Sequence, residues 1–236
     1  MSRNWLFLLL LLMSLAVFGQ DTVNQTDASG RKQGFWRKLN ERGEKIYEGH
    51  FVSDIPRGEF RYFYPDGKLK TLSVMSDSGK FSNTVSYYQN GKKMAEGNYR
   101  NGKKDSLWRF YSEYDGSLAA EEMYKDGRKN GISRNYYPGQ GMSEILHWKN
   151  GVKDGEWIEY YTDGRIKLSG FYKTDEKDGV FKAFYASGTV MSIGFYSGGH
   201  AQGTWSYFTP KGILEKLETY KDGLLIRTEE KIPPKN

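Results

Sequence analysis

A 24-residue repeat constrains the fold of this chain more than any other feature of its sequence. The repeat is aligned on a small residue, which we call the anchor of a unit. Successive anchors are separated by 24, 24, 24, 25, 24, 24 and 24 residues, and they are Gly34, Gly58, Ser82, Ser106, Gly131, Gly155, Gly179 and Gly203. Eight units therefore fill residues 34–225, and a fixed period of this length is typical of a repeat architecture.

Each unit has the same internal pattern of aromatic residues. We number positions from the anchor, so that position 2 is the second residue after it. Position 2 is occupied by Trp36, Phe60, Thr84, Trp108, Ser133, Trp157, Phe181 and Trp205, and position 5 by Leu39, Phe63, Tyr87, Tyr111, Tyr136, Tyr160, Phe184 and Phe208. Seven residues before each following anchor comes an apolar column of Phe51, Met75, Tyr99, Tyr124, Trp148, Tyr172, Tyr196 and Tyr220.

Turn residues divide each unit into two short segments. Pairs such as Asp66-Gly67 and Asp163-Gly164 follow position 5, and pairs such as Asn101-Gly102 and Asp222-Gly223 close several units. Asp or Asn followed by Gly supplies the positive φ of tight hairpin turns, and the segments between are rich in aromatic and β-branched residues. No window in the repeats keeps a helical period long enough for an ordinary helix. We therefore predict an all-β fold of tandem antiparallel β-hairpins.

A single hairpin of this kind cannot be stable alone. Ordering one unit costs tens of kcal/mol of backbone entropy, whereas each buried aromatic returns only ~2 to 5 kcal/mol. Neighbouring units must therefore stack, and we predict an elongated twisted or curved sheet or solenoid. The aromatic residues expected to pack between units are Trp36, Phe60, Trp108, Trp157, Phe181, Trp205, Tyr160 and Tyr172.

Position 3 carries a column of basic residues. Five of its eight members are basic, namely Arg37, Arg61, Arg109, Arg134 and Lys182. Because side chains alternate between the two faces of a strand, we expect this column on the same face as position 5. Two interpretations stay open. The cations bind an acidic protein, a phosphate-bearing lipid or an anionic glycan, or their stems cover the aromatic column while the charged heads stay in water.

The two ends of the chain differ from the repeat. Residues 1–19 combine Arg3, a long apolar stretch and small residues near the end, as in a secretory signal peptide, with an uncleaved anchor helix as the alternative. We predict a polar tether over residues 20–33 and a polar tail over residues 226–236. The repeats would then be exported to the periplasm, the cell envelope or the medium, with no membrane-spanning segment after cleavage.

Composition and charge narrow the possible functions. The chain has no cysteine, so disulfides and thiolate metal sites are excluded. Its net charge is +6, and removal of residues 1–19 takes away one arginine, which leaves +5. Because this excess is mild and its charges are interspersed, we do not expect a nucleic acid partner.

No catalytic, metal or cofactor site is expected. The three histidines, His50, His147 and His200, lie in different units and give no metal-ligand spacing. Glu121 and Glu122 are adjacent and point to opposite faces of a strand, so they cannot act as a paired acid and base. There is no phosphate-binding loop and no nucleophile elbow. We therefore predict a protein without enzymatic activity, metal or cofactor.

The units resemble a known repeat. The pattern G-x-W-x-x-Y-Y-x-x-G-x-I, followed by an aromatic residue and N-G-x-x-D-G, is similar to the MORN-type repeat, and its best copies run from Gly155 to Gly164 and from Gly58 to Gly67. It is most similar to the variant found in bacterial proteins of the YwqK antitoxin family. The resemblance implies a β-hairpin repeat fold and, by association, antitoxin activity. A second resemblance is to choline-binding or glucan-binding hairpin repeats, whose units are shorter.

These features together predict a non-catalytic, exported repeat scaffold at the cell envelope that binds another protein, acidic if position 3 forms the site. A cell-wall or carbohydrate-binding module is the first alternative. An antitoxin-like inhibitor of an exported toxin is the second. The irregular stretch from Ser82 to Gly141, where Thr84 and Ser133 replace the aromatic residue, is a further place to look for a site.

Overall fold

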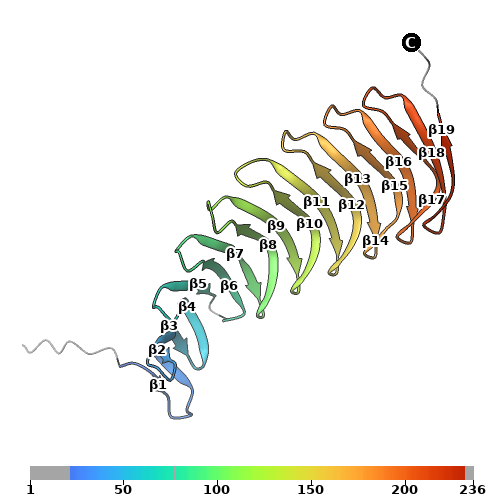
Figure 1. Ribbon diagram of the computed structural model, residues 1–236. Helices are drawn as coiled ribbons and strands as arrows, with labels where there is room; N and C mark the ends of the chain where they lie inside the picture. Colours follow the sequence, from blue (N-terminus) through green and yellow to red (C-terminus); the bar gives the residue numbers. More distant parts are fainter. Residues whose placement is uncertain (1–21, 77, 232–236) are drawn as a thin grey trace, which may run out of the picture.

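Consecutive strands pair with one another along the whole repeat. The computed structural model describes residues 22–76 and 78–231, and within these residues it contains nineteen strands and no helix. The strands form one open antiparallel sheet in chain order, in which β13 pairs with both β14 and β15. Figure 1 shows the hairpins side by side along one axis. The predicted all-β hairpin repeat is therefore confirmed.

The strands are short and are joined by tight turns. Their bounds are β1 (Gln25–Thr26), β2 (Lys32–Leu39), β3 (Lys45–Val52), β4 (Ile55–Phe63), β5 (Leu69–Met75), β6 (Phe81–Tyr87), β7 (Lys93–Arg100), β8 (Lys103–Tyr111), β9 (Leu118–Lys125), β10 (Arg128–Tyr136), β11 (Met142–Lys149), β12 (Val152–Tyr160), β13 (Ile166–Lys173), β14 (Glu176–Lys177), β15 (Gly179–Phe184), β16 (Val190–Ser197), β17 (His200–Phe208), β18 (Leu214–Lys221) and β19 (Leu224–Glu230). From β2 to β19, each unit supplies two successive strands, with β14 and β15 together taking the place of one.

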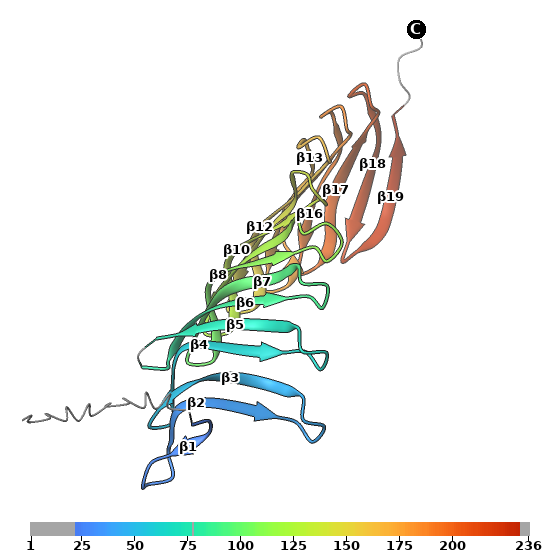
Figure 2. The ribbon, with the colours of Figure 1, turned by 90° about the vertical axis from the view of Figure 1, so that its left-hand side faces the viewer.

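The sheet is a single layer whose strands are bowed and whose axis twists (Figures 1 and 2). Its core lies on the face that carries position 2, which we call the aromatic face. Phe60 and Trp108 are each only 2% exposed, and Trp205 is 5% exposed. Because no second layer covers this face in the described residues, such burial requires the bowed strands to close around the rings.

Glycine on one strand makes room for a ring on the next. Gly49 lies beside Phe60, Gly97 beside Trp108 and Gly194 beside Trp205. A β-carbon on any of these glycines would stand less than 3 Å from the neighbouring ring. The rings also meet the apolar column, since Trp157 and Tyr172 have centroids 5.2 Å apart and Phe181 and Tyr196 have centroids 5.7 Å apart. Ring-on-glycine packing thus builds the core.

Tyrosines at position 6 tie each unit to the next. Their hydroxyls donate hydrogen bonds of 2.6 to 2.9 Å to the backbone carbonyl at position 5 of the following unit. Within the described chain these tyrosines are Tyr64, Tyr88, Tyr137, Tyr161 and Tyr185. A bulge between positions 4 and 5 recurs in the units, for example at Tyr62 and Phe63, so strict alternation of faces ends there.

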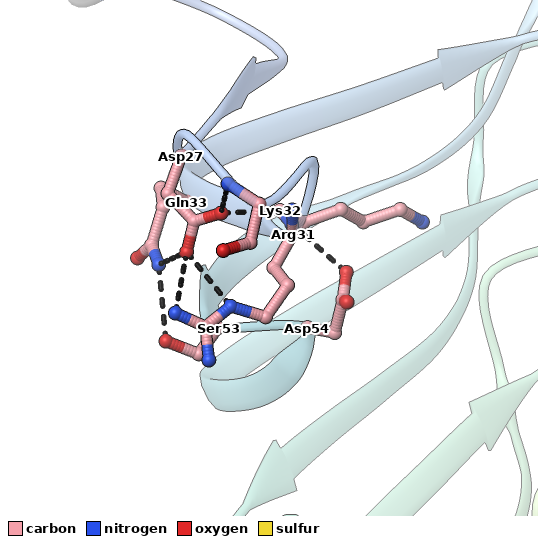
Figure 3. Close-up of polar contacts among 7 residues, drawn as sticks. Asp27, Arg31, Lys32, Gln33, Ser53 and Asp54 are labelled. Carbon is pink, nitrogen blue, oxygen red and sulfur yellow. Dashed lines mark hydrogen bonds and ion pairs between the residues drawn. The ribbon is translucent and has the colours of Figure 1, made fainter.

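The segment predicted as a tether differs from that prediction. Within residues 20–33, β1 pairs with the start of β2, and Asp27 accepts hydrogen bonds from the backbone and side chain of Arg31 and from Gln33 (Figure 3). The backbone bond from Arg31 is the main reason that the pKa of Asp27 lies below its usual value. Local polar contacts replace the missing hydrophobic period, so the first edge of the sheet is capped.

The predicted polar tail also begins later than expected. Residues 226–230 belong to β19, which pairs with β18 and exposes Leu224, Leu225 and Ile226. Residue 231 still donates a backbone bond to Glu215. The predicted signal peptide, residues 1–19, lies outside the described residues, as do residues 20, 21, 77 and 232–236.

Candidate functional site

The position 3 column lies in a row that also contains acidic residues. In the register of the sheet, Arg37 is opposite Glu48, which is opposite Arg61. Farther along, Glu96, Arg109, Glu121 and Arg134 follow one another on strands β7, β8, β9 and β10. The acids come from the other strand of each unit, so the row alternates in sign.

These acids form ion pairs with most of the predicted binding cations. Arg37 and Glu48 are 3.3 Å apart, Arg109 and Glu121 are 3.0 Å apart, and Arg134 lies 4.0 Å from Glu121. Arg61 is 2.7 Å from Glu59.

Tyrosines of position 5 complete the same row. Tyr136 donates to Glu121 and Tyr111 donates to Glu96. The bond from Tyr111 is the main cause that lowers the pKa of Glu96, while burial and Glu96 together raise the pKa of Tyr111 to about 12. In the described part of the chain, Lys182 alone among the five predicted cations forms no ion pair. The binding role of this column stays a prediction.

A second basic column lies two residues before each anchor. It reads Lys32, Pro56, Lys80, Lys104, Lys129, Lys153, Lys177 and Ala201. Six of the eight members are lysine, which makes this column more uniform than position 3. We call it the lysine column. It escaped the sequence prediction because it precedes the anchor, although its 24-residue spacing was visible there.

The lysine column lies on the aromatic face. Lys104 is opposite Tyr99 in the register, Lys153 is opposite Trp148, and Lys177 is opposite Tyr172. The ammonium groups sit over rings of their own or a neighbouring unit. The distances from Nζ to a ring centroid are 4.5 Å for Lys104 and Trp108, 4.8 Å for Lys153 and Tyr172, and 5.0 Å for Lys177 and Trp157. These are cation–π distances.

The charges of the lysine column are only partly compensated. Lys129 pairs with Glu122, which also accepts a bond from Tyr124. Burial lowers the pKa of Lys104, which three rings surround. Within residues 22–76 and 78–231, neither Lys153 nor Lys177 forms an ion pair. The aromatic face therefore carries positive charge with open anion capacity over its C-terminal half.

The aromatic face is hollowed where one ring is missing. Thr84 takes the place of the position 2 aromatic residue, and its neighbour in the register is Ser73 instead of a glycine. The two hydroxyls bond to each other at 2.9 Å and are 3% and 5% exposed. Beside them lies a hollow of about 520 Å³, within the ~300 to 1,000 Å³ usual for ligand pockets.

Hydroxyl groups and aromatic rings line this hollow. The hydroxyls come from Thr71, Ser73, Ser82, Thr84 and Ser86, and rings of Tyr62 and Tyr99 face them. Thr71 and Ser86 are bonded at 3.2 Å. Each hydroxyl can donate one bond and accept two, so the cluster keeps free bonding capacity. The second missing ring, at Ser133, leaves no such space because Trp148 donates to the Ser133 hydroxyl and Leu146 packs beside it.

The opposite face has an apolar patch in its C-terminal half. Phe171, Val180 and Phe195 are 45% to 50% exposed on strands β13, β15 and β16, and Val180 is opposite Phe195. Nothing in the structure shows what covers these side chains. The patch gives a surface for comparison with the aromatic face.

The described residues hold no cluster of three or more metal-ligating side chains. They also contain no helix that is long and apolar enough to cross a membrane. The histidines remain separate, and His147 contacts the backbone carbonyl of Glu156.

Comparison with known proteins identifies the repeat. The family described as "MORN repeat variant" matches residues 56–74, 83–101, 153–174, 177–197 and 201–222. No curated protein matches the chain. Among solved structures, "Crystal structure of accessory secretory protein 1,2 and 3 in Streptococcus pneumoniae" is similar at 23% identity, with a TM-score of 0.26, over 48% of this chain and 20% of that one.

A second similar structure is "Crystal Structure of TcdB2-TccC3-TEV", at 14% identity and a TM-score of 0.23, over 85% of this chain and 13% of that one. The chain thus spans a fifth or less of the solved chains it matches. The five matched segments coincide with units two, three, six, seven and eight. The chain therefore carries MORN repeat variants in five of its eight units.

Proposed function

We propose that this protein is a non-catalytic scaffold that binds another protein on its aromatic face. One observation carries the proposal: Lys153 and Lys177 lie over rings on an open sheet, where they form no ion pair with any described residue. Most other charges of the sheet, such as Arg109 and Lys129, are already paired. A surface with cations and rings that lack internal partners suits an external one.

The scaffold form also supports this proposal. Successive units present the same side chains at regular intervals, as in other repeat proteins that use a long surface for binding. An antitoxin-like inhibitor would be one protein of this kind, with a toxin as its partner. Such a partner would have to occupy the same face.

Site-specific cross-linking in the native host tests which face binds. A photo-reactive amino acid would replace Lys177 on the aromatic face or, in a matched variant, Phe195 on the opposite face. We expect one discrete protein adduct from position 177 and none from position 195. Adducts from position 195 alone, or the same abundant envelope proteins from both positions, would overturn the proposal.

We also propose that the scaffold acts after export. Residues 1–19 have the pattern of a signal peptide, and the turns and strands that follow need no cysteine or cofactor for stability in that environment. Fractionation of host cells, with mass spectrometry of the mature N-terminus, tests this. We expect the protein outside the cytoplasm with an N-terminus near residue 20, and a cytoplasmic chain that retains residues 1–19 would refute it.

A saccharide is the second candidate ligand, because of the hydroxyl-lined hollow at Ser73 and Thr84. Sugars both donate and accept hydrogen bonds and pack their ring faces on aromatic side chains. Retention on isolated cell wall, competed by soluble sugar, tests this function. The pair Ser73→Gly and Thr84→Phe, which fills the hollow, should abolish that retention, and unchanged retention would exclude the hollow as the site.

A further inference from the structure

We infer that the lysine column recognises an extended acidic segment whose acidic residues occur at every third position. This inference rests on the proposed protein-binding function and names the chemistry of the partner. Its basis is the geometry of the column, which repeats along the sheet axis. The relevant lysines are Lys80, Lys104, Lys129, Lys153 and Lys177.

The spacing of the column follows from the repeat. Neighbouring strands of a sheet are ~4.8 Å apart, and each unit contributes two strands, so successive lysines stand ~10 Å apart. An extended chain rises ~3.3 Å per residue, so three residues also cover ~10 Å. An acidic residue at every third position would therefore meet one lysine after another.

The backbone holds each lysine at the same place in its unit. The carbonyl of Lys104 accepts a bond from Gly127, that of Lys129 from Gly151, and that of Lys177 from Gly199, with lengths of 2.8 to 2.9 Å. Each carbonyl thus bonds the turn of its own unit. The lysines therefore form a straight register along one side of the aromatic face.

Rings beside the ammonium groups add selectivity to the charge. Lys177 lies within 5.8 Å of the centroids of Trp157, Phe181 and Tyr196, so its ammonium group is held in position by the surrounding rings. A fixed cation loses less side-chain freedom on binding than a mobile surface lysine does. The rings also offer contact area to the two residues between successive acids. The column therefore favours a peptide over a bare polyanion.

The acids of the aromatic face do not block this site. Glu122 is engaged by Lys129 and Tyr124, and Glu218 is engaged by Lys216 and Tyr220 at the far end of the sheet. Of the five lysines, only Lys129 is neutralised by such an ion pair. The segment would therefore bind most strongly around Lys153 and Lys177.

Two synthetic peptides test the inference with the full mature chain. Five units span ~50 Å, so each peptide has ~15 residues. One has glutamate at every third position, and the other has the same composition with its glutamates adjacent. Affinity is measured by calorimetry at ~0.15 M salt, where surface charges are screened beyond ~8 Å. We expect the period-three peptide to bind roughly tenfold more tightly, which corresponds to ~1.4 kcal/mol.

Variants assign the binding to the column. The pair Lys153→Gln and Lys177→Gln should weaken the period-three peptide roughly tenfold, whereas Lys149→Gln and Lys173→Gln should not, because these exposed lysines contact no ring. The pair Lys153→Arg and Lys177→Arg keeps both charges and should retain binding, even if the Gln pair proves unstable. Equal affinity for the two peptides, or equal loss in both Gln pairs, would overturn the inference.

The outcome is separate from that of the cross-linking test. A protein adduct at position 177 whose contacting segment lacks period-three acids would leave the scaffold function standing and refute this inference. Peptide binding without any adduct in the host would do the reverse. Equally tight binding of polyphosphate would show that the column responds to charge alone, and this too would refute the inference.

Discussion

The indole of Trp205 lies directly against Gly194. A β-carbon on this glycine would stand 2.0 Å from Cδ2 of the ring, far inside van der Waals contact. Gly194 has no positive φ angle, so its backbone would accept any residue. Close approach of the ring, and not backbone conformation, therefore requires glycine at this position.

Gly194→Ala should consequently destabilise the repeat by about 1 to 3 kcal/mol, as overpacking of a core does. Urea unfolding followed by tryptophan fluorescence measures the effect. Gly141→Ala is the matched control, because nothing lies within 4 Å of its β-carbon position and its φ is not positive. Equal stability of the two variants would contradict ring-on-glycine packing.

Much of this core was predictable from spacing alone. Contacts such as that between Trp157 and Tyr172 follow from a 24-residue period, because residues at equal places in successive hairpins become neighbours in the sheet. The role of Gly49, Gly97 and Gly194 was not predicted. Their function depends on a ring two strands' worth of sequence away, and glycine in a repeat of this kind was first interpreted as a turn residue.

The position 3 row shows why the site was harder to predict than the fold. Arg109 lies opposite Glu121, but this pairing depends on the register between strands, which a bulge between Phe110 and Tyr111 shifts by one residue. A column followed along one strand of each unit therefore shows only half of its row in the sheet. The acids could have been found 11 or 12 residues after each basic residue, as with Glu48 after Arg37.

Tyr161→Phe should weaken the coupling between units six and seven. Its hydroxyl donates a 2.7 Å bond to the backbone carbonyl of Phe184, and a lost hydrogen bond of this kind costs about 1 kcal/mol. Hydrogen exchange should become faster in β15 and its neighbours while the far units stay protected. Tyr114→Phe is the control, since Tyr114 is 93% exposed, and no change of exchange is expected there.

Glu218 should make the stability of the last unit depend on pH. Hydrogen bonds from Lys216, and then from Tyr220, lower the pKa of Glu218 to about 2. Because the folded pKa is lower than the unfolded one, the stabilisation is complete above about pH 4.5 and is lost as the pH falls toward about 2. Glu218→Gln should remove roughly 1 to 3 kcal/mol at neutral pH and flatten this dependence.

Urea unfolding at a series of pH values between about 2 and 7 tests the Glu218 prediction. Glu215→Gln serves as the control, because this exposed side chain contacts neither Lys216 nor Tyr220 through a hydrogen bond in the described residues. An unchanged pH profile in Glu218→Gln would mean that the carboxylate is not coupled to folding.

Ser73 and Thr84 should behave as a coupled pair. In the regular units a position 2 ring lies over glycine on the preceding strand, whereas Thr84 faces Ser73 across a 2.9 Å hydroxyl bond. Thr84→Phe alone would place a ring against the Ser73 side chain and leave its hydroxyl unpaired, and Ser73→Gly alone would enlarge the hollow. Both single variants should therefore lose about 1 to 3 kcal/mol.

The double variant restores the ring-on-glycine arrangement and fills the hollow beside Tyr99. It should be more stable than the sum of the single effects allows, with a coupling free energy of about 0.5 to 3 kcal/mol, as for residues in direct contact. A double-mutant cycle in urea measures this coupling. Simple additivity would mean that the interruption at Thr84 is not a missing ring in the repeat, and that the hollow has another structural origin.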